Sequence, residues 1–532
     1  MDYPVESFSE GERGALDPHF TNLDRPVFGL VNLPETVKGA LFARYSRYQG
    51  TLRRLYLDEF AADSAGPAET FDGEEGERAR KLYERIFLGY GDDSVAQLGG
   101  AHIACEYVSN VMTKVLQRGR LASYLEQSTR YIPYDAPMEG AGGYRYWRHE
   151  SLGPEYARAM DGLFETYSRT LPRVEAWAGG RFPRGDGESE AAHARSIRAK
   201  ALDLLRGLLP AASLSHVGIF ASGQAYEQMI LRLLASPLPE ARGYGQMILD
   251  ELKAIMPSFV ARVDRPDRGG EWVSYLEQRA AAADRWAGRL GLDSSRGGED
   301  DGGGPSVRLL DVQGSEDDLL AGLLFEAAGA SETEARSAVR SLPPDERAQM
   351  LGELMGDRRN RRHRPGRGLE SLRYRFEVVS DYGAFRDLQR HRMLTVQWQT
   401  LTPDLGAGVP GELDESGVGD DYRRGLEASR AEHARLVEAG LPALAPYALC
   451  LGYRIRYVLD MNAREAMHLV ELRSGREGHP SYRAVAHELH AQIAEVHPAV
   501  GAAMTFVDSD TEPRLERILS EIRTQARQAA TQ

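Results

Sequence analysis

The hydrophobic positions of the chain follow two different periods. In the segment YRFEVVS, residues 374–380, apolar and polar side chains alternate, which predicts a β-strand with one buried face. Other segments repeat their apolar residues at intervals of three and four, which predicts amphipathic helices. These segments are residues 197–210, 226–237, 462–473 and 482–498. The pattern therefore predicts the α+β class, with more helix than strand.

The predicted elements occur twice in the same order. In each half, an alternating stretch runs into an arginine motif, and a loop and long helices follow. The segment AHIACEYVSNVMTKVLQRGR aligns with SLRYRFEVVSDYGAFRDLQRHR, and the first arginines of the two motifs, Arg118 and Arg390, lie 272 positions apart (390 minus 118). A repeat of this length indicates a duplicated domain rather than a solenoid.

One break in composition divides the chain of 532 residues. The segment DSSRGGEDDGGGP, residues 293–305, is rich in glycine and acidic residues and has no apolar period, which is typical of a linker. We therefore predict an N-terminal domain at 1–292 and a C-terminal domain at 306–532. Residues 402–421 are rich in glycine, proline and acidic residues, which favours a loop inside the second domain.

Composition excludes several classes of protein. Hydrophobic residues make up 42% of the chain and no stretch is long and apolar enough to span a membrane, so we expect a cytoplasmic protein without membrane partners. The net charge of −14 disfavours nucleic acid as a partner. The two cysteines, Cys105 and Cys450, lie in apolar runs, so we expect core residues, with no disulfide framework and no metal site.

Each of the two arginine motifs lacks residues that the other one keeps. The first runs from Gln117 to Tyr131, QRGRLASYLEQSTRY, and the second from Gln389 to Pro403, QRHRMLTVQWQTLTP. Only the second keeps a histidine between its first arginines, and only the first keeps the later S-x-R-Y. Arginine forks suit phosphate and carbonyl oxygens, although an isolated R-H-R is more often a solvated loop.

The wider spacing resembles the signature of the flavin-dependent thymidylate synthases. There, R-H-R is followed after seven residues by serine and then by R-Y, with a glutamate two positions before the serine. A helix patterned N-x-R, with later amide or histidine and arginine positions, is the second family motif, and NAREAMHLVELR matches it. The first half also carries RGLLP, which is similar to a family stretch whose arginine contacts the nucleotide, and GYGDDSVAQLG, similar to a family segment with a hydroxyl at Ser94.

The resemblance implies two tandem domains of this family, each with a central antiparallel sheet and long helices. It implies that one half holds FAD and the other half holds the nucleotide, so that a composite site forms between unlike halves. The implied flavin-binding residues are Arg390, His391, Arg392, Asn462, Arg464, His468 and Ser94. The implied nucleotide-binding residues are Glu126, Ser128, Arg130, Arg206, Arg390 and Arg473, with Arg473 as the catalytic residue.

The activity implied by the resemblance is reductive methylation of dUMP to dTMP, with methylenetetrahydrofolate and NADPH as co-substrates. Family enzymes are tetramers with sites between subunits, so a homodimer of two-domain chains would mimic that assembly. Two alternatives remain open: another flavin-dependent C5 modification of a pyrimidine nucleotide, and a catalytically weak paralogue that binds flavin or nucleotide. The basic run at 356–367 is either a solvated loop or a site for the flavin diphosphate or an anionic partner.

Overall fold

The computed structural model describes residues 3–33, 41, 45, 48–61, 100–138, 142–292 and 305–531. The chain divides into two compact units. Unit 1 comprises residues 1–169, 208–296 and 427–450, and unit 2 comprises residues 170–207, 297–426 and 451–532. Each unit therefore includes a segment from the other half of the sequence. Most of the expected linker, and Ser94, lie outside the described residues.

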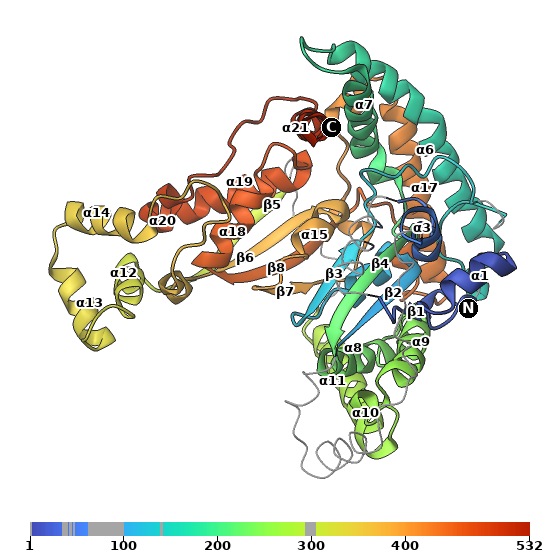
Figure 1. Ribbon diagram of the computed structural model, residues 1–532, viewed down its shortest axis with the longest axis horizontal. Coiled ribbons are helices and arrows are strands. Elements are labelled where there is room, and N and C mark those ends of the chain that lie inside the picture. The colour runs from blue at the N-terminus through green and yellow to red at the C-terminus, as the bar shows by residue number, and fades with distance from the viewer. Residues whose placement is uncertain are drawn as a thin grey trace. The chain divides into compact units, whose positions relative to one another are not determined.

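Unit 1 is built on a four-stranded antiparallel sheet with the order β1-β2-β4-β3 (Figure 1). Its strands are β1 (Val27–Gly29), β2 (Gly100–Ser109), β3 (Ala122–Glu126) and β4 (Leu214–Ser222). The helices that lie wholly in unit 1 are α1 (Glu10–Leu16), α3 (Leu52–Glu59), α5 (Asn110–Leu116), α8 (Gly223–Leu234), α9 (Pro239–Ile255), α10 (Pro257–Val260) and α11 (Glu271–Arg289).

Alternation along the strands of unit 1 gives the sheet two apolar faces. Ile103 and Cys105 of β2 pack with Val217 of β4 and with the apolar faces of α8 and α9. Ala104 points to the opposite face and packs with residues of α1, α3 and β1. The period of two along a strand produces this division.

Unit 2 repeats the architecture with the strand order β5-β6-β8-β7, also antiparallel throughout (Figure 1). Its strands are β5 (Ser306–Gln313), β6 (Arg373–Asp381), β7 (Thr395–Trp398) and β8 (Arg454–Asn462). The helices that lie wholly in unit 2 are α7 (Glu190–Leu205), α12 (Glu316–Leu324), α13 (Glu332–Ser341), α14 (Pro344–Met355), α15 (Tyr382–Leu388), α16 (Gly411–Glu415), α18 (Ala463–Arg473), α19 (Pro480–Val496), α20 (Pro498–Ala503) and α21 (Ile518–Thr531). Two more helices, α6 (Gly153–Arg181) and α17 (Gly419–Glu438), contribute residues to both units.

The two sheets confirm the predicted fold class and the duplication. The alternating segment at 374–380 lies in β6, where every second side chain is buried. Helix α5 follows β2 as α15 follows β6, and the two helices begin 272 positions apart (382 minus 110), the same offset as the arginine motifs. The four predicted helices correspond to α7, α8, α18 and α19.

One expectation needs adjustment and one is confirmed. The stretch 402–421 is not a plain loop, because it contains the short helix α16 and the beginning of α17. The cysteines are both buried, as expected, and burial raises the pKa of the Cys450 thiol to about 12. Among the described residues, no helix combines the length and the apolar character needed to cross a membrane.

Candidate functional site

Two helix starts position the second arginine motif and the N-x-R helix. Asp381 ends β6 and caps α15, its Oδ1 accepting from the backbone N–H of Ala384 at 2.8 Å. Asn462 ends β8 and caps α18 in the same way, its Oδ1 accepting from the N–H of Glu465 at 2.9 Å. Because β6 and β8 pair directly, the motif that follows α15 and the helix that follows β8 belong to one site.

His391 lies at the centre of this site and is buried. Its Nδ1 is 2.8 Å from Oε1 of Glu465, and its Nε2 accepts from Nε–H of Arg473 at 3.0 Å. Since Nε2 accepts, the proton of the neutral imidazole is on Nδ1 and is donated to Glu465. His391 therefore joins a carboxylate to a guanidinium.

The charges around His391 favour this arrangement. Burial, assisted by the positive charge of Arg473, lowers the pKa of His391 to about 4, so the imidazole is neutral near pH 7. Burial opposes ionisation of Glu465, but the hydrogen bonds from His391 and His468 outweigh it and hold the pKa of this carboxyl at about 2. The site thus contains a carboxylate, a neutral imidazole and a guanidinium in series.

His468 completes a group that has the ligand types of a metal site. Its Nδ1 is 3.3 Å from Oε2 of Glu465, and its ring meets that of His391 edge to face, with centroids 5.2 Å apart. The potential ligand atoms of His391, Glu465 and His468 lie within 4.8 Å of one another. Two histidines and a carboxylate are a zinc-type set, but the adjacent Arg473 charge disfavours a cation. The expected absence of a metal stays a prediction.

Asn462 and Arg464 have structural contacts on the same helix. Asn462 provides the cap of α18. Arg464 donates from Nε to the carbonyl of Pro365 at 3.0 Å and from Nη1 to Glu370 at 3.4 Å. These contacts tie the segment before β6 to α18, and no comparison tests the implied flavin-binding role of either residue.

Arg206 joins the first half of the sequence to the second arginine motif. It belongs to unit 2, where its Nη1 donates to Oδ2 of Asp387 at 3.4 Å. Oδ1 of the same carboxylate is 3.6 Å from Nη1 of Arg390. The Arg206 side chain is only 5% exposed. Its Nη2 lies 3.8 Å from Oδ1 of Asp381 and has no hydrogen-bond partner among the described residues. Arg206 also lines a cavity of about 280 Å³ within unit 2, together with Lys200, Asp381, Tyr422 and Arg454.

The first arginine motif lies in unit 1. Glu126 is buried at the end of β3, where its Oε2 accepts from Nζ of Lys114 at 3.0 Å and from Nε2 of Gln117 at 2.8 Å. Oγ of Ser128 accepts from the backbone N–H of Arg130 at 3.2 Å. The expected composite site would include Ser128 of unit 1 and His391 of unit 2, and it stays a prediction.

Two important residues were not identified from the sequence: Lys114 and Glu465. Both are charged and buried, each on a helix whose other buried residues are mostly uncharged. A buried charge requires a partner, so a charged residue on the buried face of a predicted helix could have indicated these positions. The comparison with the family motifs did not identify them, because they lie between the residues that the motifs match.

The solvated-loop interpretation of the basic run is wrong for one residue. Arg358 is buried against α18, where its Nη1 and Nη2 donate to the two oxygens of Glu471 at 2.8 and 2.5 Å. The Arg358 guanidinium compensates the charge of the Glu471 carboxylate, which is buried among apolar residues of α18. The remaining arginines of the run are exposed, namely Arg359, Arg361, Arg362, Arg364 and Arg367.

The chain is similar to several known proteins. The family model described as thymidylate synthase complementing protein matches residues 51–258 and 324–499. A UPF0159 protein of Chlamydia muridarum is 37% identical over 98% of this chain and 99% of its own length. A UPF0159 protein of Thermoplasma acidophilum is 29% identical over 91% of this chain and 98% of its own length. A solved UMP/dUMP methylase, PolB of Streptomyces cacaoi bound with 5-Br dUMP, is 21% identical, with a TM-score of 0.31, over 38% of this chain and 94% of that chain.

Proposed function

Because the chain belongs to the thymidylate synthase complementing protein family, we propose that it is a flavin-dependent thymidylate synthase. The proposed reaction is methylation of dUMP to dTMP, with methylenetetrahydrofolate and NADPH as co-substrates and FAD as cofactor. The observation that carries the proposal is the hydrogen-bonded series Glu465–His391–Arg473. Next to it in sequence is Arg390, which shares the carboxylate of Asp387 with Arg206.

The donor set of this site fits a flavin. Arg390 and Arg392 are both exposed, and guanidinium groups suit the phosphate and carbonyl oxygens that FAD presents. When bound, FAD would supply the hydride-transfer chemistry. We propose that Arg390, Arg392, Arg464 and His468 hold it, with Asn462 positioning the helix, and that Ser94 contributes from outside the described residues.

Both ring nitrogens of His391 are already engaged by Glu465 and Arg473. We therefore assign His391 the task of orienting Arg473 rather than a direct bond to the flavin. Arg473 uses Nε for this contact and makes a further side-chain hydrogen bond with Tyr482. A guanidinium has five N–H donors, and we propose that one of the others reaches a pyrimidine carbonyl. Stabilising negative charge on the ring oxygen would make C5 of the nucleotide more nucleophilic.

The nucleotide phosphate needs cationic donors that are not fully satisfied. Arg206 offers a buried Nη2 without a hydrogen-bond partner among the described residues. We propose that Arg206 and Arg130 bind the phosphate, with the hydroxyl of Ser128 as a further donor and Glu126 supporting this segment. The contact of Arg206 with Asp387 supports a composite site that uses both halves of the sequence. A homodimer is proposed as the assembly.

The activity test uses the purified full-length chain. We expect a flavin absorption spectrum, NADPH oxidation that depends on dUMP and methylenetetrahydrofolate, and release of tritium from C5-labelled dUMP. Flavin binding without turnover would instead indicate a catalytically weak paralogue. Tritium release from a different pyrimidine nucleotide, with none from dUMP, would indicate another C5 modification.

Substitution of Arg473 tests the assignment of the site. We expect Arg473→Ala to lower dUMP-dependent turnover at least about 100-fold, because a charge-assisted contact to the reacting ring is lost. Arg424→Ala is the matched control, since the Arg424 side chain is 70% exposed and pairs only locally with Asp421. Equal activity of both variants would refute the assignment.

A further inference from the structure

A second cavity lies within unit 1, and its lining differs from the set of proposed nucleotide-binding residues. Its volume is about 900 Å³, and its lining includes Glu6, Arg54, Tyr107, Arg145 and His216. Glu126, Ser128, Arg130 and Arg206 are not among the lining residues. The function proposed above therefore leaves this cavity unexplained.

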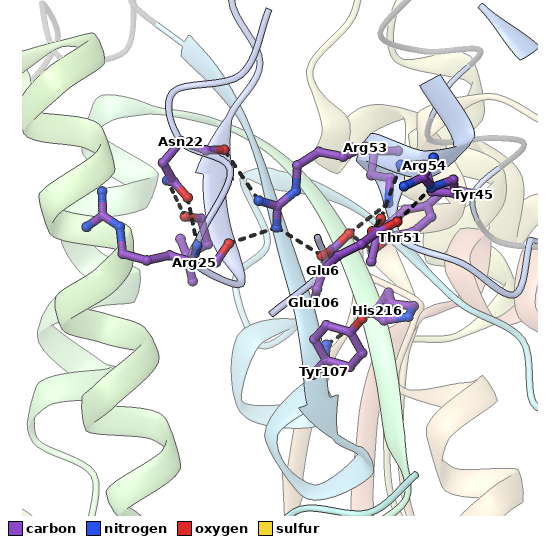
Figure 2. Close-up of polar contacts among 12 residues, drawn as sticks. Glu6, Asn22, Arg25, Tyr45, Thr51, Arg53, Arg54, Glu106, Tyr107 and His216 are labelled. Atoms are coloured by element: carbon purple, nitrogen blue, oxygen red, sulfur yellow. Dashed lines mark hydrogen bonds and ion pairs between the residues drawn. The ribbon is translucent and has the colours of Figure 1, made fainter. Parts of the chain in front are cut away.

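A bulge in β2 shapes one wall of the cavity. The pairing of β2 with β4 shifts between Cys105 and Val108, and Tyr107 has a φ of 57°, in the left-handed region. This conformation is unfavourable for a non-glycine residue and persists only where its surroundings hold it. The neighbouring residue Glu106 provides that hold (Figure 2): it is fully buried, accepts from the N–H of Leu52 at 2.7 Å and pairs with Arg53 at 3.3 Å.

The bulge determines the tautomer of His216. The backbone N–H of Tyr107 points at His216 and donates to its Nδ1 at 3.1 Å (Figure 2). Since Nδ1 accepts, the proton of a neutral imidazole must be on Nε2. Burial lowers the pKa of His216 well below its ordinary value, which agrees with a neutral ring.

Two buried donors then face each other. Nε2–H of His216 is 3.5 Å from Nη2 of Arg145, which is itself a donor and already donates to Oε1 of Gln127 at 2.7 Å. His216 is 1% exposed and Arg145 is 9% exposed, so bulk water does not satisfy these groups. Among the described residues, Nε2 of His216 has no acceptor, and a buried N–H without an acceptor is unfavourable.

We propose that this cavity is a second ligand site, for a small organic anion whose carboxylate or phosphate oxygen accepts from both His216 Nε2 and Arg145. The charge of Arg145 compensates that of the oxyanion. The other positive group of the lining, Arg54, is already paired with Glu6 at 2.7 Å, so it does not compete for the ligand. The carboxylates of Glu6 and Asp135, on the same cavity, favour a ligand that carries amino or hydroxyl donors at its other end.

Thermal unfolding of the full-length chain tests the proposal. Sodium phosphate and sodium acetate would each replace sodium chloride at constant ionic strength, because a ligand that binds only the folded state raises the unfolding midpoint. We expect at least one of the two anions to raise the midpoint in a saturable way. A response to phosphate or to acetate would identify which oxyanion the site takes.

Variants locate the response. Arg145→Gln and His216→Phe each remove one of the two donors, and we expect the apparent affinity for the anion to fall at least tenfold in both. Phosphate also binds the proposed nucleotide phosphate site, so all of these chains carry Arg130→Gln and Arg206→Gln, which remove that site. Arg424→Gln in the same background is the matched control, because Arg424 is exposed on α17, and it should leave the response unchanged. A response that survives Arg145→Gln and His216→Phe would overturn the proposal, as would no response to either anion in the background that keeps Arg145 and His216.

A crystal structure of the wild-type chain grown in phosphate or acetate gives an answer independent of the variants' folding. Density for the anion between His216 Nε2 and Arg145 supports the proposal. Protein atoms or an empty space at that position refute it. Neither result depends on dUMP or flavin binding, so this test and the activity test can fail separately.

Discussion

At the scale of single residues, the candidate site depends on which atom carries a proton. His391 is neutral because it is buried, and it can receive the Arg473 N–H only because Glu465 accepts its Nδ1 proton. Neither fact is visible in the R-H-R spacing. The R-H-R motif drew attention to His391, while the residues that define its protonation state, Glu465 and Arg473, lie on α18.

Glu465 is the residue through which this arrangement can be tested. We expect Glu465→Ala to lower dUMP-dependent turnover by about 10- to 100-fold, because His391 would lose its acceptor and Arg473 its orientation, a loss of about 1–3 kcal/mol. Glu465→Gln should retain more activity, since its amide oxygen still accepts from Nδ1. Steady-state NADPH oxidation measures both.

The control for Glu465 is Glu427→Ala, because Glu427 is exposed on α17 and pairs with Arg430, three residues along the helix. Equal turnover of Glu465→Ala and Glu427→Ala would mean that Glu465 does not position the series.

At the scale of elements, the same junction is built twice in each unit. Ser109 caps α5 where Asp381 caps α15, and Ser222 caps α8 where Asn462 caps α18. A strand that ends on a capping residue turns directly into a helix, because the side chain satisfies the first free N–H groups. The repeated caps show why both arginine motifs follow a short helix at the same offset.

Asn462 has both an observed cap and an implied flavin contact, and two substitutions separate them. We expect Asn462→Ala to lower the free energy of unfolding by about 1 kcal/mol through loss of the cap. Asn462→Asp should keep the cap and remove the amide N–H donors. Reduced FAD affinity with unchanged stability in Asn462→Asp would assign the amide to the flavin, and unchanged affinity would leave only the cap. Urea unfolding and flavin titration measure the two properties.

A buried carboxyl links three elements of unit 1. Glu240 in the first turn of α9 accepts from the N–H of Ser109 at 2.8 Å and from the hydroxyl of Tyr447 at 2.7 Å. Burial, opposed by these hydrogen bonds, raises the pKa of Glu240 to about 7 from its ordinary 4.5. Between about pH 4.5 and about pH 7, the folded chain therefore keeps a proton on Glu240 that the unfolded chain has released.

This titration predicts the direction of a pH effect. The contribution of Glu240 to the free energy of unfolding is complete below about pH 4.5 and is lost as the pH rises to about 7. Relative to Glu240→Gln, which does not titrate, we expect the wild type to lose up to about 3 kcal/mol across this range. Urea unfolding at several pH values measures the difference. Parallel pH curves for the two chains would contradict the prediction.

At the scale of the whole molecule, the compact units do not coincide with the two halves of the sequence. Residues 170–207 of the first half belong to unit 2, and residues 427–450 of the second half belong to unit 1. Arg206 reaches Asp387 and the second arginine motif through this exchange. The domain limits expected at 292 and 306 stay a prediction. They describe where the linker lies, and the exchange of residues 170–207 and 427–450 does not test that.

Mixed dimers test whether one chain supplies both Arg206 and Arg473. If the chain forms a homodimer, we expect no recovery of turnover when Arg206→Ala chains are mixed and refolded with Arg473→Ala chains, because each site would contain one defect. Recovery to about a quarter of wild-type turnover would place the two arginines of one site on different chains. Light scattering of each sample confirms that dimers are present.

The same experiment with Arg130→Ala addresses the remaining pair. Arg130 belongs to unit 1, so mixing Arg130→Ala with Arg473→Ala reports whether unit 1 of one chain serves unit 2 of the same chain or of its partner. Here recovery would indicate an interchain site. Absence of recovery would indicate an intrachain site.

The sequence by itself determined the fold class, the duplication and the position of the second arginine motif. Periods of two and of three to four report which faces of an element are buried, and a repeated motif at a constant offset reports a repeated architecture, so neither depends on long-range contacts. Only the tertiary structure decided that Glu465 and Arg473 meet His391, that Arg358 is paired with Glu471, and that Arg206 lies beside Asp387. The two residues of each pair are far apart in sequence, so no periodic pattern predicts that they meet. Burial removes water from these charged groups, and they therefore need a partner of opposite charge or a hydrogen bond.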